Sequence, residues 1–343
     1  MVDTLKRTDK KINRIMYDWL TFTSKIHSVP DLVQLLGLSD VPFENAKGRY
    51  CYADRLTYDG INIYFNGADD MGICVELSGQ GCRNFESFGN GDYNSIFRLI
   101  NENYDIKSDN RKMNITRLDV AYDDFMGLLD LDYLMKSVQL GDYVSRLKRA
   151  GCHWDNQQGC TVYHGSERQS SVYVRIYDKL VEQVKVRNKN IDLSIKHWVR
   201  CEIQMKDICA KGFISLGGDI RKNYFEVLNN YLRYVVSSDD SNKRRLGISP
   251  QWLNFIESWE SVSIFDKPGM EYNVLNLDSY VTNQLSGAII TYASTVGIDT
   301  FLQNIVDARK GKKLNPKYEK ILKETQSSTD SILEYLELKK EMY

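Results

Sequence analysis

Three segments of the sequence each place an arginine two residues before a group that could act on a phosphate. The segments are TRLDVAYDD, VYVRIYDK and VRCEIQMK. Apolar residues dominate alternate positions in each of them, which predicts β-strands with one buried face and one polar face. The polar rows contain these candidate groups: Arg117 with Asp119 and Asp123, Arg175 with Tyr177 and Lys179, and Arg200 with Glu202.

These residue types together favour metal-assisted transfer of a phosphoryl group onto a tyrosine. Carboxylate oxygens such as those of Asp119 and Glu202 are the hard ligands that Mg²⁺ or Mn²⁺ prefers. Arginine suits phosphate because its guanidinium group binds through two parallel hydrogen bonds. A phenol such as that of Tyr177 becomes a nucleophile beside a base or a metal. We therefore expect the three polar rows to lie on one face of one sheet.

Each pair taken alone also has a structural interpretation. An arginine two residues from a carboxylate on a strand is commonly part of a cross-strand ion pair, and strand tyrosines are common because they pack well. Only the coincidence of three such strands favours a reactive site. His153 and His164 fall on the hairpin before the Tyr177 strand, where either one could line the site or simply pack.

The order of the expected elements indicates an α+β protein in which a similar set of strands and helices occurs twice. The first set has strands at residues 18–23, 49–54, 61–66 and 71–77 and helices at 30–36 and 93–104. The second set has strands at residues 114–123, 152–154, 160–163, 172–177 and 197–205 and helices at 131–140, 207–211 and 221–236. This repetition predicts a duplicated antiparallel-sheet domain with flanking helices.

A polar segment, SSDDSNKRR, follows the second set and predicts a linker or an exposed loop. Beyond it the apolar spacing is mostly helical, at residues 250–259, 277–296, 298–310, 316–325 and 328–340. We therefore expect a catalytic domain over residues 1–236, a linker over 237–248 and a helical C-terminal module over 249–343.

Composition limits the class of protein. The 343 residues include 45 Lys and Arg against 46 Asp and Glu, so any basic surface must come from clustering. Seven cysteines without a CxxC pair argue for reduced thiols and against a zinc site. No apolar run reaches the ~20 residues of a membrane span, and we expect a cytoplasmic protein that contacts no membrane. The sequence contains no phosphate-binding loop of the form GxxxxGK followed by Ser or Thr.

The segments TRLDVAYDDF, GCTVYHGSERQSSVYVRIYDK and RCEIQMK, together with the earlier MGICVELSGQGCR, resemble in order and spacing the replication-initiation (Rep_trans) family of rolling-circle plasmids and phages. That family includes relaxases of integrative conjugative elements. The resemblance covers roughly residues 17–234. It implies that Tyr177 nicks DNA and keeps a 5′-phosphotyrosine, and that Asp119, Glu202 and Asp123 hold Mg²⁺ or Mn²⁺.

The same resemblance assigns basic residues to DNA. Arg175 and Lys179 would grip the phosphates beside the nick, and Arg117 and Arg200 would contact DNA from the neighbouring strands. Arg83, in a segment expected to form a turn, could also meet DNA. The C-terminal module has a basic run that includes Lys312 and Lys313. This run would either bind the duplex origin in a sequence-specific way or form a solvated charged face.

Other functions remain open at this point. A relaxase of an integrative conjugative element would use the same chemistry at a transfer origin. A non-catalytic DNA-binding protein would carry the tyrosine row only for packing, and an RNA-binding sheet would need more exposed aromatic residues. The expected partners are DNA that is single-stranded at the nick, a host helicase and, as one way to complete a second cleavage, another copy of the chain in a homodimer.

Overall fold

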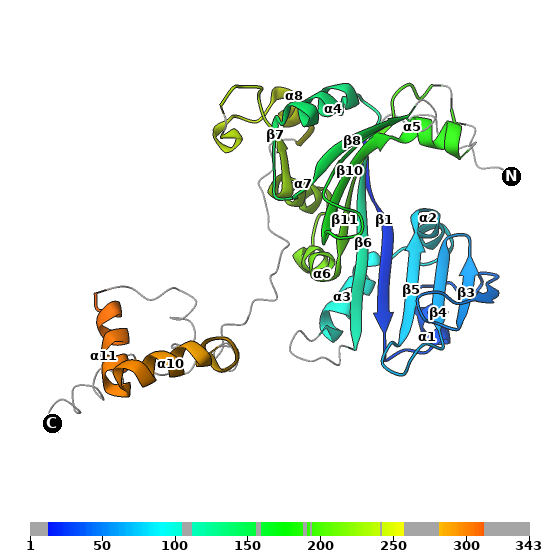
Figure 1. Cartoon of the computed structure of the whole chain (residues 1–343). Helices are drawn as coiled ribbons and strands as arrows, with labels where there is room; N and C mark the ends of the chain where they lie inside the picture. The colour runs from blue at the N-terminus through cyan, green and yellow to red at the C-terminus, as the bar shows by residue number, and fades with distance from the viewer. Residues whose placement is uncertain are drawn as a thin grey trace. The chain divides into compact units, whose positions relative to one another are not determined.

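The computed structural model describes residues 13–104, 112–155, 159–187, 191–192, 194–240, 242–256 and 281–311. The chain divides into two compact units, Met1–Asp266 and Lys267–Tyr343. The larger unit is an α+β domain around one antiparallel sheet, and the smaller unit is helical where it is described, which confirms the expected fold class (Figure 1).

A ten-stranded sheet forms the centre of the larger unit, in the order β2-β3-β4-β5-β1-β6-β11-β10-β9-β8. Its strands are β1 (Arg14–Ser24), β2 (Glu44–Lys47), β3 (Asp54–Tyr58), β4 (Ile61–Phe65), β5 (Ile73–Ser78), β6 (Met113–Asp124), β8 (Ala150–Asp155), β9 (Gly159–His164), β10 (Val172–Asp178) and β11 (Val199–Lys206). All of the paired neighbours run antiparallel. A second, two-stranded sheet pairs β7 (Tyr143–Ser145) with β12 (Leu232–Tyr234).

The helices of the larger unit lie between groups of these strands along the chain. They are α1 (Val29–Leu35), α2 (Gly79–Phe88), α3 (Tyr93–Asn103), α4 (Leu131–Leu140), the short α5 (Lys179–Val181), α6 (Asp207–Leu216), α7 (Ile220–Tyr231) and α8 (Pro250–Ile256). Local sequence explains their ends: Asp130 caps the first turn of α4 through the Tyr133 amide, and Gly141 stops it in the left-handed conformation.

The sheet is built from two halves with the same order of elements. The first half runs β1-α1-β2-β3-β4-β5-α2-α3, and the second runs β6-α4-β8-β9-β10-β11-α6-α7 with β7 inserted. In the sheet, β1 of the first half lies beside β6 of the second, and the other strands follow outward in matching order. The first strands of the two halves therefore meet at the centre of the sheet.

One face of the sheet packs against helices and the other is polar. Alternate residues such as Phe22, Val75 and Val120 are fully buried in one apolar core that also includes Phe85 of α2 and Phe225 of α7. Contacts of α2, α3, α6 and α7 with the central strands place these helices on the core face (Figure 1). The other alternate residues carry the polar rows identified in the sequence, which leaves the opposite face for chemistry.

Two local expectations were wrong, for steric and packing reasons. The ELSGQGCR segment is not a turn but the end of β5 followed by α2, because glycine lets this helix approach the β3–β4 turn: a Cβ on Gly81 would lie 2.1 Å from the Gly60 carbonyl oxygen. The strand expected at residues 49–54 is displaced, since Tyr50 and Cys51 have positive φ angles in the loop between β2 and β3.

The expected boundary at residue 249 is also corrected, because α8 packs into the core of the larger unit. Trp252, Phe255 and Ile256 are at most 2% exposed, and the Trp252 ring lies 4.8 Å from that of Tyr234. The preceding segment is fixed rather than a free linker, since Val235 bridges Ile248 and Lys243 pairs with Asp142 at 3.0 Å. The division between the units instead falls at Asp266.

The described part of the smaller unit is a helical hairpin. A π-helix (Val281–Leu285) leads into α10 (Ser286–Val296), and α11 (Ile298–Arg309) follows after Gly297. Gly297 has φ 86° and ψ 148°, a region open essentially to glycine alone, and it allows Tyr292 and Phe301 to pack at 5.7 Å. The helices expected at residues 316–325 and 328–340, and Lys312 and Lys313, lie outside the described residues. Among the described helices, none has the length and apolarity needed to cross a membrane.

The packing of α8 predicts that Trp252 stabilises the larger unit. Trp252→Ala should lower the free energy of unfolding by about 3–5 kcal/mol, because it leaves a large cavity in a filled core. Leu253→Ala on the same helix is the control, since Leu253 is 42% exposed and should change stability little. Urea denaturation measures both, and equal effects of the two variants would show that α8 does not belong to this core.

His164 predicts a loss of stability in acid. It is fully buried on the core face of β9, with Nε2 2.8 Å from Tyr234 Oη, and burial lowers its pKa from 6.5 to about 3. The unfolded chain binds the proton more strongly, so this contribution is fully present above about pH 6.5 and decreases toward pH 3, by about 2 kcal/mol at pH 5.

Urea denaturation at pH 7.5 and pH 5 would measure this loss. His164→Gln should reduce the difference in unfolding free energy between the two pH values, whereas His153→Gln, on the exposed edge strand β8, should not. An unchanged difference in the His164 variant would assign the acid sensitivity to other groups.

Candidate active site

Strand register brings the three polar rows of the sequence onto one face. Arg175 on β10 lies opposite Glu202 on β11, and Tyr177 lies opposite Arg200. On the other side of β11, Arg200 pairs with Asp123 of β6, while Gln204 pairs with Asp119. The arrangement expected for these strands is therefore present: the two carboxylates, the phenol and the arginines lie on the face opposite the helix-covered core.

Tyr177 lies at the centre of a group of charged side chains. Its hydroxyl donates to Glu202 Oε2 at 3.4 Å and accepts from Lys179 Nζ at 3.3 Å. The guanidinium carbon of Arg175 lies 4.7 Å from the centre of the Tyr177 ring. Burial first, and then the charge of Glu202, raise the pKa of Tyr177 well above its usual value. The phenol is therefore protonated at neutral pH and needs help to become a nucleophile.

Asp119 and Glu202 are both held by arginines that reach solvent. Arg117 donates to Asp119 from Nε at 2.9 Å and from Nη2 at 2.5 Å, and Arg175 Nη2 lies 3.1 Å from both carboxylate oxygens of Glu202. The side chains of Arg117 and Arg175 are 27% and 38% exposed, whereas the two acids are almost fully buried. The acids are therefore accessible only from the polar face.

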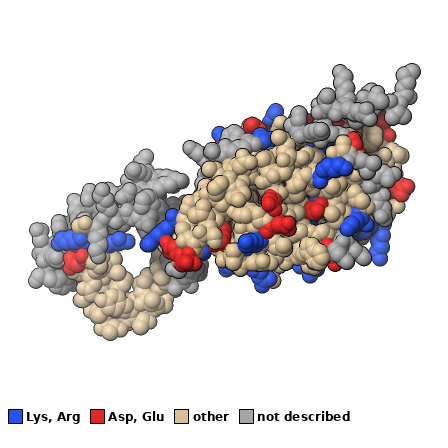
Figure 2. Space-filling model, turned by 90° about the horizontal axis from the view of Figure 1, so that it is seen from above, with Lys and Arg blue, Asp and Glu red and all other residues tan. Residues whose placement is uncertain are grey.

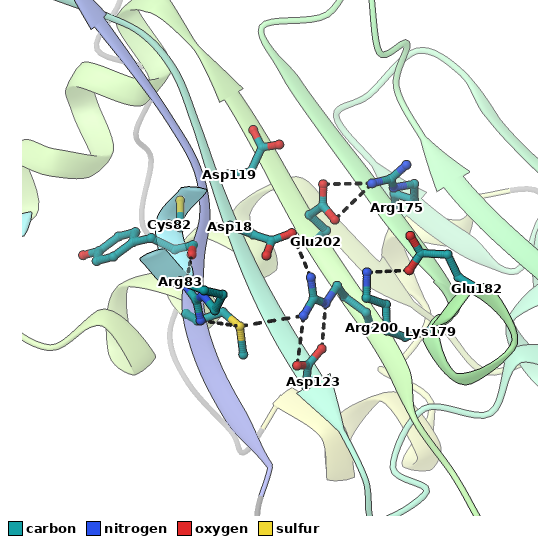
Figure 3. A network of polar contacts seen from close by, with 12 residues as sticks. Asp18, Cys82, Arg83, Asp119, Asp123, Arg175, Lys179, Glu182, Arg200 and Glu202 are labelled. Atoms are coloured by element: carbon teal, nitrogen blue, oxygen red, sulfur yellow. Dashed lines mark hydrogen bonds and ion pairs between the residues drawn. The ribbon is translucent and has the colours of Figure 1, made fainter. Parts of the chain in front are cut away.

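A third carboxylate, that of Asp18, adds to the negative charge around Asp119. Burial raises the pKa of Asp119 to about 7, Arg117 opposes this shift, and the negative charges of Glu202 and Asp18 add to it. Figure 3 shows Asp18, Asp119 and Glu202 around the same part of the sheet face. Sequence alternation did not identify Asp18, because it occupies a bulge between Tyr17 and Trp19 in the pairing of β1 with β6.

This donor set suits a magnesium-type ion. No group of three His, Cys, Asp or Glu side chains in the described part of the chain is already placed to hold a metal. Mg²⁺ is commonly bound by one or two carboxylates, with water and substrate phosphates completing its coordination. A divalent cation would offset the negative charge that Glu202 and Asp18 add to Asp119 beyond what Arg117 balances, so Asp119 and Glu202, with Asp18 nearby, fit such an ion.

Asp123 has different partners from those expected of a metal ligand. Arg200 holds its carboxylate at 2.6 and 3.0 Å, and Arg14 adds a contact at 3.0 Å. Burial would raise the pKa of Asp123, but Arg200, together with Trp198 and Arg14, lowers it below its usual value. Arg200 is itself buried and also binds Asp18 at 2.8 Å, as Figure 3 shows. This ion pair serves the structure, because neither partner is presented to solvent.

Two further basic residues bind protein groups as well. Arg83 lies on α2 and donates to the Tyr17 carbonyl at 2.5 Å and to Glu86 at 2.6 Å, so it braces α2 against β1. Lys179 pairs with Glu182 at 2.5 Å, and burial, followed by the positive charge of Arg200, lowers the pKa of Lys179. Glu182 was not anticipated, because it lies on a π-helix (Glu182–Val186) that follows α5.

The two histidines considered from the sequence lie on different faces. His164 is on the core face opposite Val174, which separates it from Tyr177. His153 pairs with Thr161, which in turn pairs with Tyr177, so His153 is on the polar face two strands away. His164 therefore does not line the site, and His153 is exposed at its edge strand.

The first half of the sheet contains a second tyrosine–glutamate pair at the matching positions. Glu76 lies between Thr21 and Asn62 as Glu202 lies between Ala121 and Arg175. Tyr64, two residues after Asn62, donates to Glu76 at 3.0 Å. Trp19 stands where the second half has Asp119, and Asn62 stands in place of Arg175. This copy therefore lacks the second acid and the arginine.

Comparison with known proteins agrees with this division into halves. The Rolling Circle replication initiation protein N-terminal domain family matches residues 14–102, and the Replication initiation factor family (Rep_trans) matches residues 113–306, which begin with β6. The putative DNA relaxase NicK of Bacillus subtilis (strain 168) is 28% identical over 271 residues, which are 75% of this chain and 74% of the relative.

A solved structure shows the same fold. The rolling circle replication initiator protein from Geobacillus stearothermophilus superposes with a TM-score of 0.60 at 30% sequence identity, over 72% of this chain and 96% of that one. The Replication initiation factor family alone matches more than half of the sequence, over the strands that carry Tyr177, Asp119 and Glu202. On these grounds the chain belongs to the rolling-circle replication initiator and relaxase family.

Proposed function

We propose that this protein starts rolling-circle replication by nicking one DNA strand with Tyr177. The phenolic oxygen of Tyr177 attacks the phosphodiester and becomes bonded to phosphorus, while the bond from phosphorus to the 3′ oxygen breaks. The products are a 5′-phosphotyrosine and a 3′-hydroxyl, which can prime synthesis or later reverse the reaction. The observation that carries this proposal is the contact of Tyr177 with both Glu202 and Lys179 on the open face of the sheet.

The side chains around Tyr177 support separate parts of this reaction. Glu202 accepts the hydrogen bond of the phenol and is placed to take its proton as the bond to phosphorus forms. Lys179 is placed to offset negative charge on the phenolic oxygen. The Arg175 side chain is 38% exposed beside Tyr177, so its guanidinium group suits the scissile phosphate.

A divalent ion, Mg²⁺ or Mn²⁺, would be held by Asp119 and Glu202, with Asp18 nearby. When bound, it would stabilise the charge that develops on the phosphate oxygens in the transition state. Asp123 would not contact the ion, because Arg200 and Arg14 occupy its carboxylate.

DNA contacts would come from a subset of the basic residues first considered. Arg175 and Arg117 reach the open face, and Lys179 lies beside the Tyr177 hydroxyl while paired with Glu182. Arg200 and Arg83 act through the protein groups they bind. Lys312 and Lys313 are retained as candidates for reading the duplex origin, which phosphate contacts alone cannot specify. A host helicase would separate the strands in the cytoplasm, and a second copy of the chain would serve the second cleavage, because Tyr64 lies in the incomplete copy of the site.

A relaxase acting at a transfer origin is the second candidate function. The similarity to the putative DNA relaxase NicK favours it, and the chemistry at Tyr177 would be the same. The two functions are separated by testing which DNA the protein nicks. Nicking of the replication origin of the element that encodes the chain would support an initiator, and nicking of its transfer origin would support a relaxase.

The nucleophile is tested by a matched pair of tyrosine variants. Tyr177→Phe should abolish the covalent protein–DNA adduct on a single-stranded oligonucleotide, because only the phenolic oxygen can form the bond. Tyr64→Phe removes the hydroxyl of the matching residue and should leave adduct formation within about twofold of the parent. Denaturing gels and peptide mass spectrometry give the readout, and an adduct on any other residue would refute the assignment. Loss of the adduct without loss of DNA binding would also exclude a purely DNA-binding role.

The acids are tested in the same paired way. Glu202→Gln should slow nicking by about 10²–10⁴-fold, as expected for loss of a general base, and Asp119→Asn by more than about 100-fold. Glu76→Gln, in the matching position of the first half, should leave the rate nearly unchanged. Single-turnover nicking at increasing Mg²⁺ or Mn²⁺ measures the effect. If Glu202→Gln and Asp119→Asn both nicked DNA at the wild-type rate in the presence of a chelator, the metal mechanism would be contradicted.

A further inference from the structure

A hollow lies on the polar side of the larger unit, further along the same strands that carry the site. Its volume is about 590 Å³, and it is lined by residues of β7, the β7–β8 connection, the start of β8, β9, the β9–β10 loop and the start of β10. The residues that matter here are Lys148, Arg149, Tyr163 and Tyr173, which we call the strand track. Tyr163 pairs directly with Arg175, and Tyr173 precedes Arg175 by two residues on β10, so the track continues the row of Tyr177.

The two tyrosines of the strand track form an aromatic surface on the sheet. Their ring centres are 6.5 Å apart, and both rings are only partly buried. Gly151, opposite Tyr163 in the register, makes this surface possible: a Cβ there would lie 2.5 Å from the Tyr163 hydroxyl oxygen. The ring of Tyr163 thus lies over Gly151 of β8, and any residue with a side chain at position 151 would displace the ring. Flat aromatic faces of this kind stack on unpaired bases.

The two cations of the strand track are exposed and free to bind an anion. They lie in the segment SRLKRAG, which has no acidic residue. Neither Lys148 nor Arg149 forms an ion pair with any residue that the structure describes, in contrast to Arg117, Arg175 and Arg200. Glu167 is the acid that also lines the hollow. On the face shown in Figure 2 most of the described surface is uncharged, and basic side chains occur in small separate groups.

Hydrogen bonds to backbone carbonyls hold the β7–β8 connection and the β9–β10 loop in place. The Gly165 amide donates to the Arg149 carbonyl at 2.7 Å, which ties the β9–β10 loop to the β7–β8 connection. Lys206 Nζ donates to the Glu167 carbonyl, and Gln204 donates to the same oxygen at 3.2 Å. A surface held in this way loses little conformational freedom when a ligand binds.

We propose that the strand track binds the single-stranded DNA next to the nick, with bases on Tyr163 and Tyr173 and backbone phosphates on Lys148 and Arg149. This inference rests on the proposed role of Tyr177, and it adds a site that fixes the register of the strand before cleavage. Single-stranded DNA fits because its bases expose their faces, whereas duplex DNA offers phosphates without open faces.

Binding is measured separately from cleavage, with Tyr177→Phe protein in a chelator and a labelled oligonucleotide that spans the nick site. In this background Tyr163→Ala should weaken binding by between about 5-fold and about 150-fold, the range for loss of one stacked base. Tyr163→Phe keeps the aromatic face and should bind within about twofold of the parent. An equal loss with the phenylalanine variant would overturn the stacking role.

The cations are tested by the salt dependence of the same binding. Lys148→Gln with Arg149→Gln should reduce the slope of log affinity against log salt by about 1.4, because two phosphate contacts are lost. The matched control removes two exposed cations elsewhere, Arg98 on α3 and Lys136 on α4, by the same change to glutamine. Equal slopes for the two double variants would overturn the proposal.

Two further measurements place the contact and identify its ligand. In a series of oligonucleotides, one abasic site is moved stepwise along both sides of the nick. At one position, loss of the base should weaken binding by the parent protein but not by the Tyr163→Ala variant. Fully paired duplex of the same sequence should bind parent and Tyr163→Ala protein alike, and an equal loss on duplex would overturn the single-strand assignment. Failure of these tests with a normal Tyr177 adduct would reject the strand track alone, whereas an absent adduct with normal track binding would reject the proposed nucleophile.

Discussion

The ion pair of Arg200 with Asp123 and Asp18 is the interaction on which the site depends. Its three residues come from β11, β6 and β1, so the buried guanidinium on β11 joins that strand to β6 and β1, the two central strands of the sheet. A buried charge is tolerated only when it is paired, and removing one partner typically costs about 3–5 kcal/mol. Because these charges are paired, they hold β11, β6 and β1 in register while the same face carries the charged residues around Tyr177.

Exposure separates the charges that build the site from those that can meet a substrate. Arg200 and Asp123 are buried and already paired with each other, whereas Arg175 and Arg117 cover the acids from the solvent side. These outer arginines neutralise Glu202 and Asp119 before any ligand arrives. In the proposed reaction, a metal ion would take the place of the arginines beside the two acids, and the phosphate of the DNA would bind the arginines that are released.

The two halves of the sheet show how one architecture is used in two ways. Tyr64 and Glu76 repeat the contact of Tyr177 with Glu202, but Asn62 also donates to Glu76 at 3.1 Å and Tyr50 approaches it at 3.5 Å. Neutral donors thus satisfy the Glu76 carboxylate, and burial and Glu76 raise the pKa of Tyr64 to about 12. The first half therefore completes the sheet, while the second half holds the groups proposed to react.

Strand alternation in the sequence was sufficient to group Tyr177, Arg175, Glu202 and Asp119, because neighbouring strands in register must place alternate residues on one face. The same regularity predicted the duplicated strand order. What it could not predict depends on contacts between distant segments: the bulge that brings in Asp18, the pairing of Asp123 with Arg200, and the burial of Trp252 in the core. A local pattern specifies which face a side chain joins, but only the packed sheet decides which partner it finds there.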